Sequence, residues 1–416
     1  MRSHYKRIGD YVTQIKLKNT NDSISSLKGI NINKHFMPSV ANINGTDLSK
    51  YRVVKKNQFA FNPMHVGRDE VLPISMLEDD EPIIVSPAYV VFEVKDEEEL
   101  LPAYLMMWCR RSEFDRNAWF MTDNSVRGGF SWADFCDMEL PVPSIEKQRE
   151  IVREFNVVND RIALNEQLTQ KLEDTAQAIY KQWFVDFEFP ISKEYAESIG
   201  KPELEGKPYK SSGNELEYCN DAKLSAPLTW GSVPFTKLFK LGSGGTPSTA
   251  VPEYWNDEVK FFTGRDIKKS FYTLATEKSI SKLGLNRSSS KLYPKNTTFI
   301  VARGATTGAT ALSGDEMAMN QSCYAVVASD TTKFFAHQTT LYLIAKIKDS
   351  IFSGAIFNAL VTKDFDEQLL SKPPLELQEQ FHKLVEPLYT SLILRAKENQ
   401  LNLELRKLLL TKMSKA

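Results

Sequence analysis

A glycine-rich segment at residues 241–247, which reads LGSGGTP, is the first place where the chain could bind a phosphate. A P-loop needs a Gly-Lys-Ser/Thr triplet at fixed spacing, and none follows here. A dinucleotide-binding loop must open a βαβ unit, and the sequence that follows lacks this pattern. The glycines therefore predict a turn in which the backbone comes close to another group, either within the fold or on a ligand.

Two other segments resemble fragments of catalytic motifs. Residues 62–65 (NPMH) resemble the Asn-Pro-Pro-aromatic loop of amino-methyltransferases, but the second proline and the aromatic residue are missing. No glycine-rich motif for S-adenosylmethionine lies upstream. Residues 203–207 (ELEGK) contain an acidic-x-Lys triplet like that of metal-dependent nucleases, but no predicted strand would hold the carboxylates. We therefore predict neither activity in this chain.

The residues that usually bind metals are few and scattered. Cys109, Cys136, Cys219 and Cys323 include no C-x-x-C pair and have no histidine at ligand spacing, which argues against zinc. A disulfide framework is not expected in a chain this long with four cysteines. None of the five histidines, His337 included, has an evident nucleophile partner. No metal site and no catalytic residue is predicted.

Length and hydropathy are typical of a globular protein of two or three domains. The chain has 416 residues, of which 42% are hydrophobic and 25% are charged. It has no run of 18 or more apolar residues, so we expect no transmembrane helix. Its first residues lack the apolar stretch of a signal peptide. We therefore expect a cytoplasmic protein without a membrane partner.

Charge is distributed unevenly, although the net charge is −1. Residues 1–68 hold 12 Lys/Arg against 3 Asp/Glu, and residues 260–303 hold 10 against 2. Residues 69–100 hold 11 Asp/Glu and 1 Lys. Two basic blocks in a near-neutral chain are compatible with two contacts to phosphate backbones. The alternative is that these charges spread over all faces once the chain folds.

The chain contains a repeat with a period of about 230 residues, because residues 141–148 (PVPSIEKQ) recur as residues 371–378 (SKPPLELQ). At this offset Ile8 falls on Leu238. The apolar positions after the repeat have gaps of 4, 3 and 4 in both copies, which is typical of a helix of coiled-coil type. These positions are Ile151, Phe155, Val158 and Ile162 in the first copy, and Phe381, Val385, Leu388 and Leu392 in the second. Further on, at an offset of 233, Leu168, Leu172 and Ala176 pair with Leu401, Leu405 and Leu409.

Each copy of the repeat ends in a long predicted helix. The first runs from about residue 145 to about residue 184, or roughly 60 Å at about 1.5 Å per residue. Pro141 and Pro143 favour an extended segment before it, and Ser144 is its expected N-cap. The second starts after Pro374 and runs nearly to the end of the chain. Pro387 lies inside it and should kink or split it.

Short apolar runs between turn signals predict strands in both globular parts, with a helix at residues 102–108. The runs are at residues 82–85, 89–94, 298–301 and 323–327. We therefore predict a mixed α/β fold with pseudo-repeated globules. Its segments are a first globule at 1–143, a long helix at 144–189, a linker with some local order at 190–230, a second globule at 231–372 and a long helix at 373–416.

Taken together, these motifs resemble the specificity subunits of type I restriction–modification systems over nearly the whole chain. Residues 164–168 and 172–187 are similar to the central conserved region of that family, and residues 403–410 to the distal one. Residues 34–39 and 61–68 resemble one subtype of its target-recognition domains. The second globule is similar to another subtype at GGTPS (244–248), PEYW (252–255), FTGRDI (262–267), RGATTG (303–308) and NQ (320–321).

The resemblance implies a DNA-binding protein without catalytic activity of its own. Each globule would be a target-recognition domain that reads one half of a split double-stranded DNA sequence. The two long helices would pack antiparallel as a coiled coil, separate the domains and bind two methyltransferase subunits that methylate adenine. Two motor-restriction subunits would complete the enzyme. The resemblance implies no cofactor in this chain, since S-adenosylmethionine, ATP and Mg²⁺ would belong to the partner subunits.

Candidate residues follow from these landmarks and from the basic blocks. Arginine reads guanine through two hydrogen bonds, and asparagine or glutamine reads adenine similarly. The DNA-binding candidates are Lys34, Asn62 and Arg68 in the first globule, and Thr246, Arg265, Lys268 and Arg303 in the second; a structural or plain surface role is the alternative for each. The candidates for helix–helix contacts and methyltransferase binding are Ile151, Phe155, Leu168, Leu172, Ile179, Trp183, Leu401 and Leu405; ordinary core packing is the alternative.

Two functions of other classes remain as alternatives. One is an adaptor that binds only proteins through its coiled coil, and the duplicated basic globules argue against it. The other is the DNA-recognition part of a fused endonuclease–methyltransferase, and the absence of both catalytic motifs argues against that. Salt-dependent binding to duplex DNA would separate the first alternative from a DNA-reading subunit, and a methylation assay on the chain alone would test the second.

Overall fold

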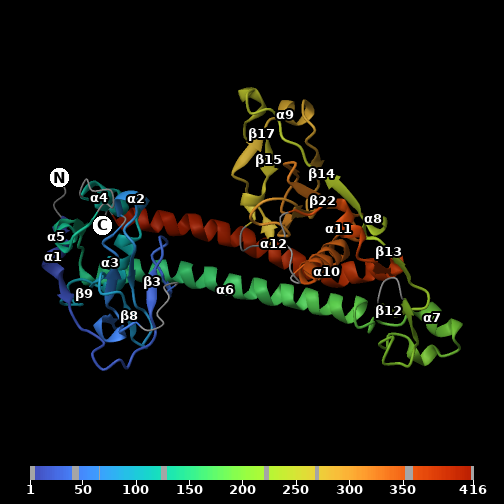
Figure 1. Ribbon diagram of the computed structural model, residues 1–416, viewed down its shortest axis with the longest axis horizontal. Coiled ribbons are helices and arrows are strands. Elements are labelled where there is room, and N and C mark those ends of the chain that lie inside the picture. The colour runs from blue at the N-terminus through green and yellow to red at the C-terminus, as the bar shows by residue number, and fades with distance from the viewer. Residues whose placement is uncertain are drawn as a thin grey trace. The chain divides into compact units, whose positions relative to one another are not determined.

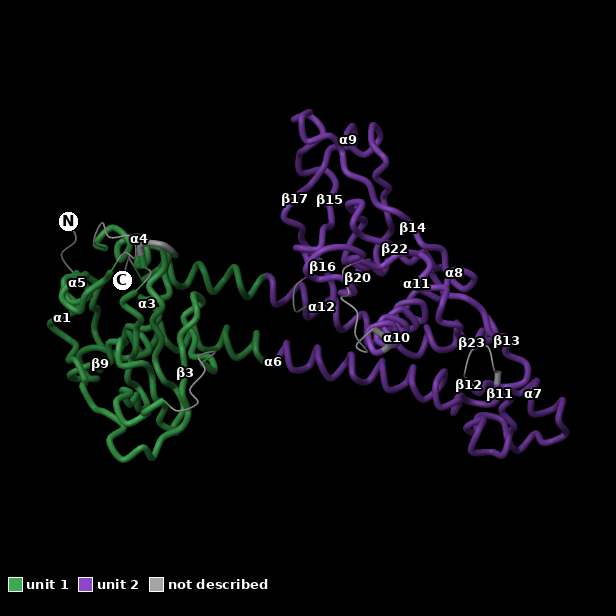
Figure 2. Tube along the Cα trace, viewed as in Figure 1, with its two compact units in different colours: residues 1–163, 401–416 green, residues 164–400 purple. Residues whose placement is uncertain are grey.

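The computed structural model of the chain describes residues 5–39, 46–64, 66–122, 129–219, 224–267, 271–351 and 359–413. The chain divides into two compact units (Figure 2). The first comprises residues 1–163 and 401–416, and the second comprises residues 164–400. Two long helices, α6 (Ile145–Phe184) and α12 (Leu375–Lys412), each contribute residues to both units.

The sequence explains where the long helices begin. Ser144 lies directly before α6, and its hydroxyl oxygen accepts a hydrogen bond from the Lys147 N–H over 3.4 Å, as an N-cap residue does. α6 has the bounds that the sequence predicts. Of the two outcomes expected at Pro387, a split does not occur, because α12 is continuous through it. Val385 and Tyr389 are both buried beside the proline, so packing of this face offsets the missing hydrogen bond.

The first unit is built on a four-stranded antiparallel sheet with the order β2-β9-β6-β7, of which β9 is labelled in Figure 1. Its strands are β2 (Val12–Ile15), β9 (Val90–Val94), β6 (Phe59–Phe61) and β7 (Ile74–Met76). Two-stranded pairs accompany it: β1 (Tyr5–Arg7) with β10 (Glu139–Pro141), β3 (Lys28–Ile30) with β4 (Phe36–Pro38), and β5 (Arg52–Val54) with β8 (Ile83–Val85). The short helices are α1 (Ile8–Tyr11), η1 (Leu48–Lys50), α2 (Val66–Asp69), α3 (Pro102–Cys109), α4 (Ser112–Phe120) and α5 (Trp132–Asp137).

Aromatic side chains fill the core of this unit. Phe61 and Phe92 come from adjacent strands, and Phe135 of α5 packs on both, with ring centroids 5.4 and 4.8 Å away. All three are fully buried. Phe155 of α6 and Met413 beyond the end of α12 belong to the same core. The helix pair is therefore part of the interior of this unit, where each such side chain contributes about 1.5–3 kcal/mol by burial.

The second unit contains two larger sheets. The first has the order β14-β22-β19-β20-β16, with β14 (Lys240–Ser243), β22 (Cys323–Val327), β19 (Thr298–Val301), β20 (Thr310–Ser313) and β16 (Tyr272–Thr273). The second has the order β17-β15-β21-β18, with β17 (Lys278–Ile280), β15 (Val259–Phe262), β21 (Met317–Met319) and β18 (Leu292–Tyr293). Smaller elements are β11 (Leu216–Cys219), β12 (Leu224–Pro227), β13 (Gly231–Val233), β23 (Leu370–Lys372), α7 (Lys193–Ser198), η2 (Pro202–Leu204), α8 (Phe235–Leu238), η3 (Pro252–Tyr254), η4 (Gly264–Asp266), α9 (Lys282–Asn286), α10 (Lys333–Ile351) and α11 (Thr362–Asp366). The strands and the 102–108 helix predicted from the sequence are therefore present in the two units.

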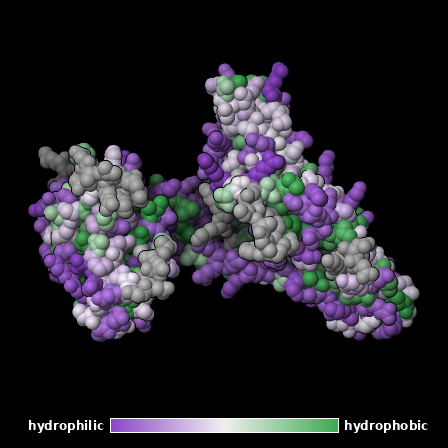
Figure 3. Space-filling model, in the orientation of Figure 1, coloured by the Kyte–Doolittle hydropathy of each residue, from purple (hydrophilic) through white to green (hydrophobic). Residues whose placement is uncertain are grey.

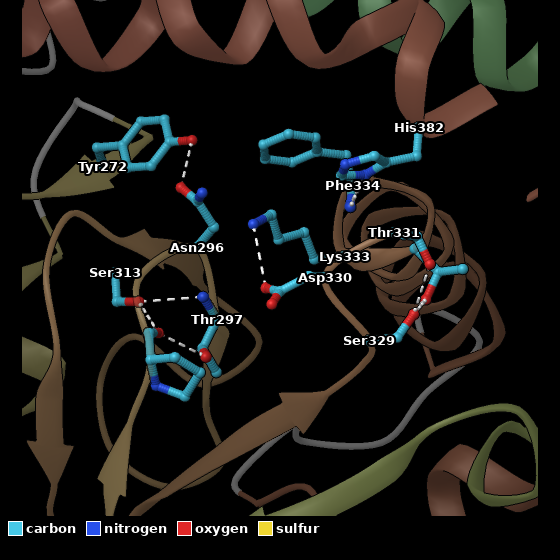
Figure 4. Close-up of polar contacts among 12 residues, drawn as sticks. Tyr272, Asn296, Thr297, Ser313, Ser329, Asp330, Thr331, Lys333, Phe334 and His382 are labelled. Atoms are coloured by element: carbon cyan, nitrogen blue, oxygen red, sulfur yellow. Dashed lines mark hydrogen bonds and ion pairs between the residues drawn. The ribbon is translucent and has the colours of Figure 1, made fainter. Parts of the chain in front are cut away.

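The first turn of α10 fixes the second globule to the part of α12 in the same unit. Phe334 stacks on Tyr389 with ring centroids 4.0 Å apart, and on His382 at 4.8 Å. The Nδ1 atom of His382 accepts a hydrogen bond from the Phe334 N–H over 3.4 Å (Figure 4). Burial lowers the pKa of His382, which suits a neutral ring that accepts this bond. Figure 4 also shows the Ser313 hydroxyl oxygen, which accepts from the Thr297 N–H over 3.0 Å and closes the turn before β19.

The two units repeat one architecture. The sheet order β2-β9-β6-β7 of the first unit matches β14-β22-β19-β20 of the second, and the pair β1/β10 matches β13/β23. A side-chain bond recurs at the start of each long helix. The Nε2 atom of Gln148 donates to the Pro143 carbonyl, and that of Gln378 donates to the Pro373 carbonyl, both over 2.9 Å. The duplication that the sequence predicts thus extends to equivalent side-chain hydrogen bonds in the two copies.

The N-terminal part of the repeat needs a correction. Ile8 begins α1 and Phe235 begins α8, and each of these helices joins the outer two-stranded pair to the first strand of the main sheet. Both side chains are fully buried. Ile8 therefore corresponds to Phe235 rather than to Leu238, as the offset of 230 had suggested. A few identities in short elements were too little to fix the alignment there.

The two long helices run antiparallel in each unit. In the second unit, Tyr180 and Phe184 near the end of α6 contact Phe381 near the start of α12, with ring centroids 5.9 and 5.3 Å apart. Earlier on α6, the Asn165 amide donates to the Glu398 carboxylate over 3.0 Å. In the first unit, Asn159 of α6 accepts from Arg406 of α12 over 3.5 Å. Residue numbers along α12 therefore rise as those of the contacting residues on α6 fall, as expected for antiparallel helices.

The face of α12 that packs in the first unit differs from the predicted one. Leu401 is 65% exposed and Leu405 is 43% exposed, whereas Leu409 is buried as predicted. The residues that turn inward have gaps of 4, 3 and 4 and are Asn402, Arg406, Leu409 and Met413. An apolar stripe could not reveal this seam, because half of its residues are polar.

Residues 187–219 and 224–230, most of which belong to the segment 190–230 predicted as a linker with some local order, pack within the second unit. Phe189 lies between Tyr209 and Trp230, with ring centroids 4.7 and 5.0 Å away and both pairs stacked. All three rings are buried in the main core of this unit. The segment is therefore a packed extension, and its aromatic residues had no period in the sequence that would have indicated this.

Candidate nucleic-acid interface

Loops of the second globule meet at one edge of its sheets. β14 ends at Ser243 opposite Tyr324, and β19 ends at Val301 opposite Cys323, both near the start of β22. β15 and β21 run parallel to each other and end together, because their carboxyl ends share one edge. We call the connecting residues 244–248, 263–267, 302–309 and 320–322 the loop edge.

Backbone hydrogen bonds hold these loops to one another. The Asn320 N–H donates to the Phe262 carbonyl over 3.0 Å, and the Ala302 N–H donates to the Ser322 carbonyl over 2.8 Å. The loop edge is therefore a connected surface whose side chains project from a fixed backbone.

The glycine-rich segment forms the tightest contact of the loop edge. The Gly245 N–H donates to the Met319 carbonyl over 3.0 Å. A Cβ atom on Gly244 would overlap the backbone carbonyl of Asn320. The close approach expected from the glycines is thus an approach to the protein's own backbone.

Arg265 is held in place by a turn with reciprocal capping bonds. The Asp266 carboxylate accepts from the Thr263 N–H over 2.7 Å, and its other oxygen accepts from the Glu277 N–H over 2.7 Å. Asp266 is buried, so its charge serves the local fold. Arg265 is exposed, and no described residue forms an ion pair with it. Its guanidinium is thus available to an anion or a base edge.

Arg303 lies on the neighbouring loop. It follows Ala302, which is bonded to the turn before β22, and precedes Gly304, whose φ of 116° suits only glycine. Arg303 is exposed and makes no ion pair within the described ranges of the chain. The structure brings Arg265 and Arg303 to one edge of the second globule, and their contact with DNA stays a prediction. Lys268, the other basic candidate, lies outside the described residues.

Thr246 also lies on the loop edge and is exposed. Its hydroxyl donates a hydrogen bond to the Oε1 atom of Gln321. Gln321 was not among the candidates from the sequence, although it belongs to the NQ landmark. The signal that identifies it is a contact across 75 residues, which no local pattern contains.

The matching edge of the first unit contains Asn62. β6 ends at Phe61 opposite Val90, so Asn62 and Tyr89 are neighbours. The Asn62 Oδ1 atom accepts from the Met64 N–H over 3.0 Å, and the side chain is also hydrogen-bonded to the Tyr89 hydroxyl. Asn62 is half-buried, so part of its amide faces solvent.

Lys34 is buried, and the hypothesis that it contacts DNA is therefore wrong. It is 4% exposed, and its ammonium forms a 2.7 Å ion pair with Asp115 and donates to the Cys109 carbonyl. The ammonium also lies 4.9 Å from the centre of the Phe114 ring. Burial lowers the pKa of Lys34, and the Asp115 carboxylate opposes this effect. One positive charge of the basic block 1–68, that of Lys34, is thus buried and paired inside the first unit.

The remaining candidates differ in exposure. Arg68 lies in α2, and its side chain is outside the described residues. Ile151 and Phe155 are buried in the first unit and Trp183 in the second, whereas Leu168, Leu172 and Ile179 are half-buried. Leu401 and Leu405 are exposed. Leu408, three residues after Leu405, lies on the same face of α12 and is exposed as well. Figure 3 shows hydrophilic and hydrophobic side chains interspersed over the visible surface.

The metal-binding residue types stay dispersed in the described part of the chain. No cluster of three or more His, Cys, Asp or Glu residues there could hold a metal ion. Burial lowers the pKa of His337 to about 3, and its ring is bonded to Thr298 over 3.0 Å inside the second unit. Within the described residues, no helix combines the length and apolar character needed to cross a bilayer.

Comparison with known proteins gives a consistent result. Residues 227–403 match the family described as type I restriction modification DNA specificity domain. The type I restriction enzyme HindI specificity subunit of Haemophilus influenzae is 24% identical over 426 aligned positions, which cover 92% of this chain and 91% of that one. The MjaIX specificity subunit of Methanocaldococcus jannaschii is 22% identical over 283 positions, covering 67% of this chain and 60% of that one. A crystal structure of a type I restriction–modification S subunit from M. genitalium has a TM-score of 0.56 at 12% identity and covers 98% of this chain and 95% of that one.

Proposed function

The chain belongs to the family of type I restriction–modification specificity subunits, and we propose that each of its two globules reads one half of a split duplex DNA target. The protein is the non-catalytic DNA-recognition subunit of such a system. The observation that carries the proposal is the loop edge, where Arg265 and Arg303 are exposed and unpaired with any described residue. Two guanidinium groups on a rigid backbone suit contacts to phosphates and to guanine.

In this proposal the second reading domain spans residues 231–372 and the first spans residues 1–143. Thr246, Arg265, Lys268 and Arg303 serve the second domain, and Asn62 and Arg68 serve the first. Phosphate contacts position a protein on DNA, whereas contacts to base edges select the sequence. We assign base reading to the arginines of the loop edge, because their loops are held by hydrogen bonds that fix their direction.

The helix segments 144–189 and 373–416 then bind the partner subunits in the cytoplasm. Ile151, Phe155 and Trp183 stabilise the helix pair from inside, with Leu168, Leu172 and Ile179 at its margin. Leu401 and Leu405 face solvent and are available to a methyltransferase subunit. The complete assembly would contain two methyltransferase subunits and two motor-restriction subunits. S-adenosylmethionine, ATP and Mg²⁺ would be bound by those partners.

Co-expression with the methyltransferase subunit tests this function directly. The genome of the host is mapped for N6-methyladenine with and without this chain. We expect one new motif of two short half-sites around a spacer of fixed length. If the same methyltransferase is active with another specificity subunit but gives no new motif with this chain, the proposed function is refuted.

Variants of the loop edge and of the helices test the two parts of the proposal separately. Arg265→Ala and Arg303→Ala should each relax one base position at a cost of about 1–3 kcal/mol in discrimination. An unchanged motif removes that residue from the set of base readers. Insertion or deletion of one turn in both long helices should change the spacer length, since a turn adds about 5.4 Å. A spacer that stays the same would show that the helices do not set it.

A further inference from the structure

The turn between β21 and β22 presents Gln321 on the loop edge. Asn320, which precedes it, donates its N–H to the Phe262 carbonyl over 3.0 Å. The Asn320 side chain accepts from the Ser322 N–H over 3.1 Å, and its carbonyl accepts from the Cys323 N–H over 3.3 Å. The backbone is therefore fixed on both sides of Gln321, while the Gln321 side chain is exposed.

The amide of Gln321 is also oriented by the fold. The Thr246 hydroxyl donates to its Oε1 atom. The loop that carries Thr246 is anchored in turn, because the Ser290 hydroxyl donates to the Gly245 carbonyl over 2.7 Å. No described residue accepts a hydrogen bond from the Nε2 atom of Gln321. With its oxygen engaged, the amide offers its two N–H donors to a ligand.

A guanidinium lies on the adjacent loop. The bond from the Ala302 N–H to the Ser322 carbonyl is 2.8 Å long. Arg303 and Gln321 each lie one residue from this bond, and both are exposed. This part of the loop edge therefore presents hydrogen-bond donors from two side chains.

We propose that Gln321, oriented by Thr246, selects a guanine in the second half-site through the acceptors of its major-groove edge. This inference rests on the proposed function and names one of its base readers. Guanine presents two acceptors there, O6 and N7, whereas adenine presents one acceptor beside a donor. A free glutamine reads adenine with both its oxygen and its nitrogen. An amide whose oxygen is bonded to Thr246 offers mainly donors, and these match guanine.

The rigidity of the site supports a role in reading bases. A side chain that is already oriented loses less conformational entropy when it binds, so more of its hydrogen-bond energy appears as discrimination. A phosphate contact would gain little from this arrangement, because phosphate binding relies on charge and Gln321 is neutral. Thr246 acts in this scheme as a positioning residue.

The test uses the complex of this chain with its methyltransferase partner and reads N6-methyladenine across a host genome. Gln321→Glu keeps the size of the side chain and removes both donors. We expect the wild-type motif to be methylated about 10- to 100-fold less. The base preference of the variant should change at one G·C pair of the second half-site only. Gln321→Met removes the amide without adding a charge and should affect the same pair. Asn117→Asp, the same amide-to-acid change at an exposed position on α4 of the first unit, is the control and should leave the second half-site unchanged.

Thr246→Val gives the sharper result. Valine keeps the shape of threonine but cannot donate to Oε1, which frees the amide to present its oxygen. We expect the same position to accept adenine beside guanine.

Distinct outcomes would overturn the inference. An unchanged motif and rate for Gln321→Glu and Gln321→Met would exclude Gln321 as a reader. A uniform loss at all positions would indicate a general contact to the DNA backbone instead. A motif as strict as that of the wild type for Thr246→Val would exclude the orienting role. If the wild-type complex itself methylates no split motif, the proposed function fails, and this result is seen before any variant is made.

Discussion

Glu173 should make the protein less stable as the pH rises, and its replacement by glutamine should remove this effect. The residue lies on α6 in the second unit and is 4% exposed. Its Oε2 atom is buried, and no described residue gives it a hydrogen bond. Burial raises the pKa of Glu173 to about 9, and the nearby Asp174 adds to this shift. The carboxyl is therefore neutral in the folded protein at pH 7.

The size of the effect follows from the two protonation states. The unfolded carboxyl loses its proton near its usual pKa of 4.5, whereas the folded one keeps it up to about pH 9. Unfolding thus releases a proton between these values, and the free energy of unfolding falls by about 1.4 kcal/mol for each pH unit in this range. From pH 5 to pH 8 the loss is about 4 kcal/mol.

Denaturant unfolding followed by circular dichroism at several pH values measures this loss. Glu173→Gln cannot ionise, so the difference in free energy of unfolding between variant and wild type should grow by about 4 kcal/mol from pH 5 to pH 8. The difference should become constant about one pH unit below 4.5, where the carboxyl is protonated in both states. Glu166→Gln, at an exposed position on the same helix, is the control, and its difference should stay flat. A difference for Glu173→Gln that is equally flat would refute the reasoning, because it would mean that the folded carboxyl is charged throughout.

Three further variants test the packing described above. Phe381→Ala should lower the free energy of unfolding by about 3–5 kcal/mol, while Leu384→Ala, at an exposed position of the same helix, should change it by less than about 0.5 kcal/mol; equal effects in denaturant unfolding would contradict the assigned seam. Gly244→Ala should abolish reading of the second half-site in the methylation map, because its Cβ meets a backbone carbonyl, whereas Gly231→Ala has open space and should behave as the wild type. Lys34→Met should destabilise the protein by about 3 kcal/mol, since it removes the ion-pair partner of the half-buried Asp115 carboxylate; a variant with normal stability and a weaker, salt-dependent DNA affinity would restore Lys34 to the DNA-binding residues.

The sequence predicted the elements whose signals are local. The bounds of α6 follow from a proline pair, an N-cap and an apolar stripe, all within one stretch of chain. The repeat predicted the second long helix and the duplicated architecture, because the same residues begin each helix. The positions of Arg265 and Arg303 on one edge followed from family landmarks, and the register of the strands explains why these landmarks meet.

The errors concern contacts that depend on distant residues. Lys34 belongs to a basic block, and only the fold shows that Asp115, 81 residues away, takes up its charge. Gln321 is one of many polar residues in a turn until Thr246 is seen beside it. The packed aromatic residues of 187–230 come from separate short elements, so no period connects them. Composition could not distinguish these cases from an exposed lysine, an ordinary turn or a linker.

The seam between the long helices shows the limit of apolar patterns most clearly, and it has a consequence for function. Asn165 is fully buried on α6 and is hydrogen-bonded to Arg395, Glu398 and Asn399 of α12, each over 3.0 Å. An all-apolar seam would be easier to predict and more stable, but it would accept neighbouring registers about equally well. A buried asparagine costs stability and is satisfied in one register only. In a protein whose helices are proposed to space two reading domains, a single register defines a single spacing. The polar residues of the seam, which no apolar pattern predicts, are thus the ones that restrict the two helices to one register.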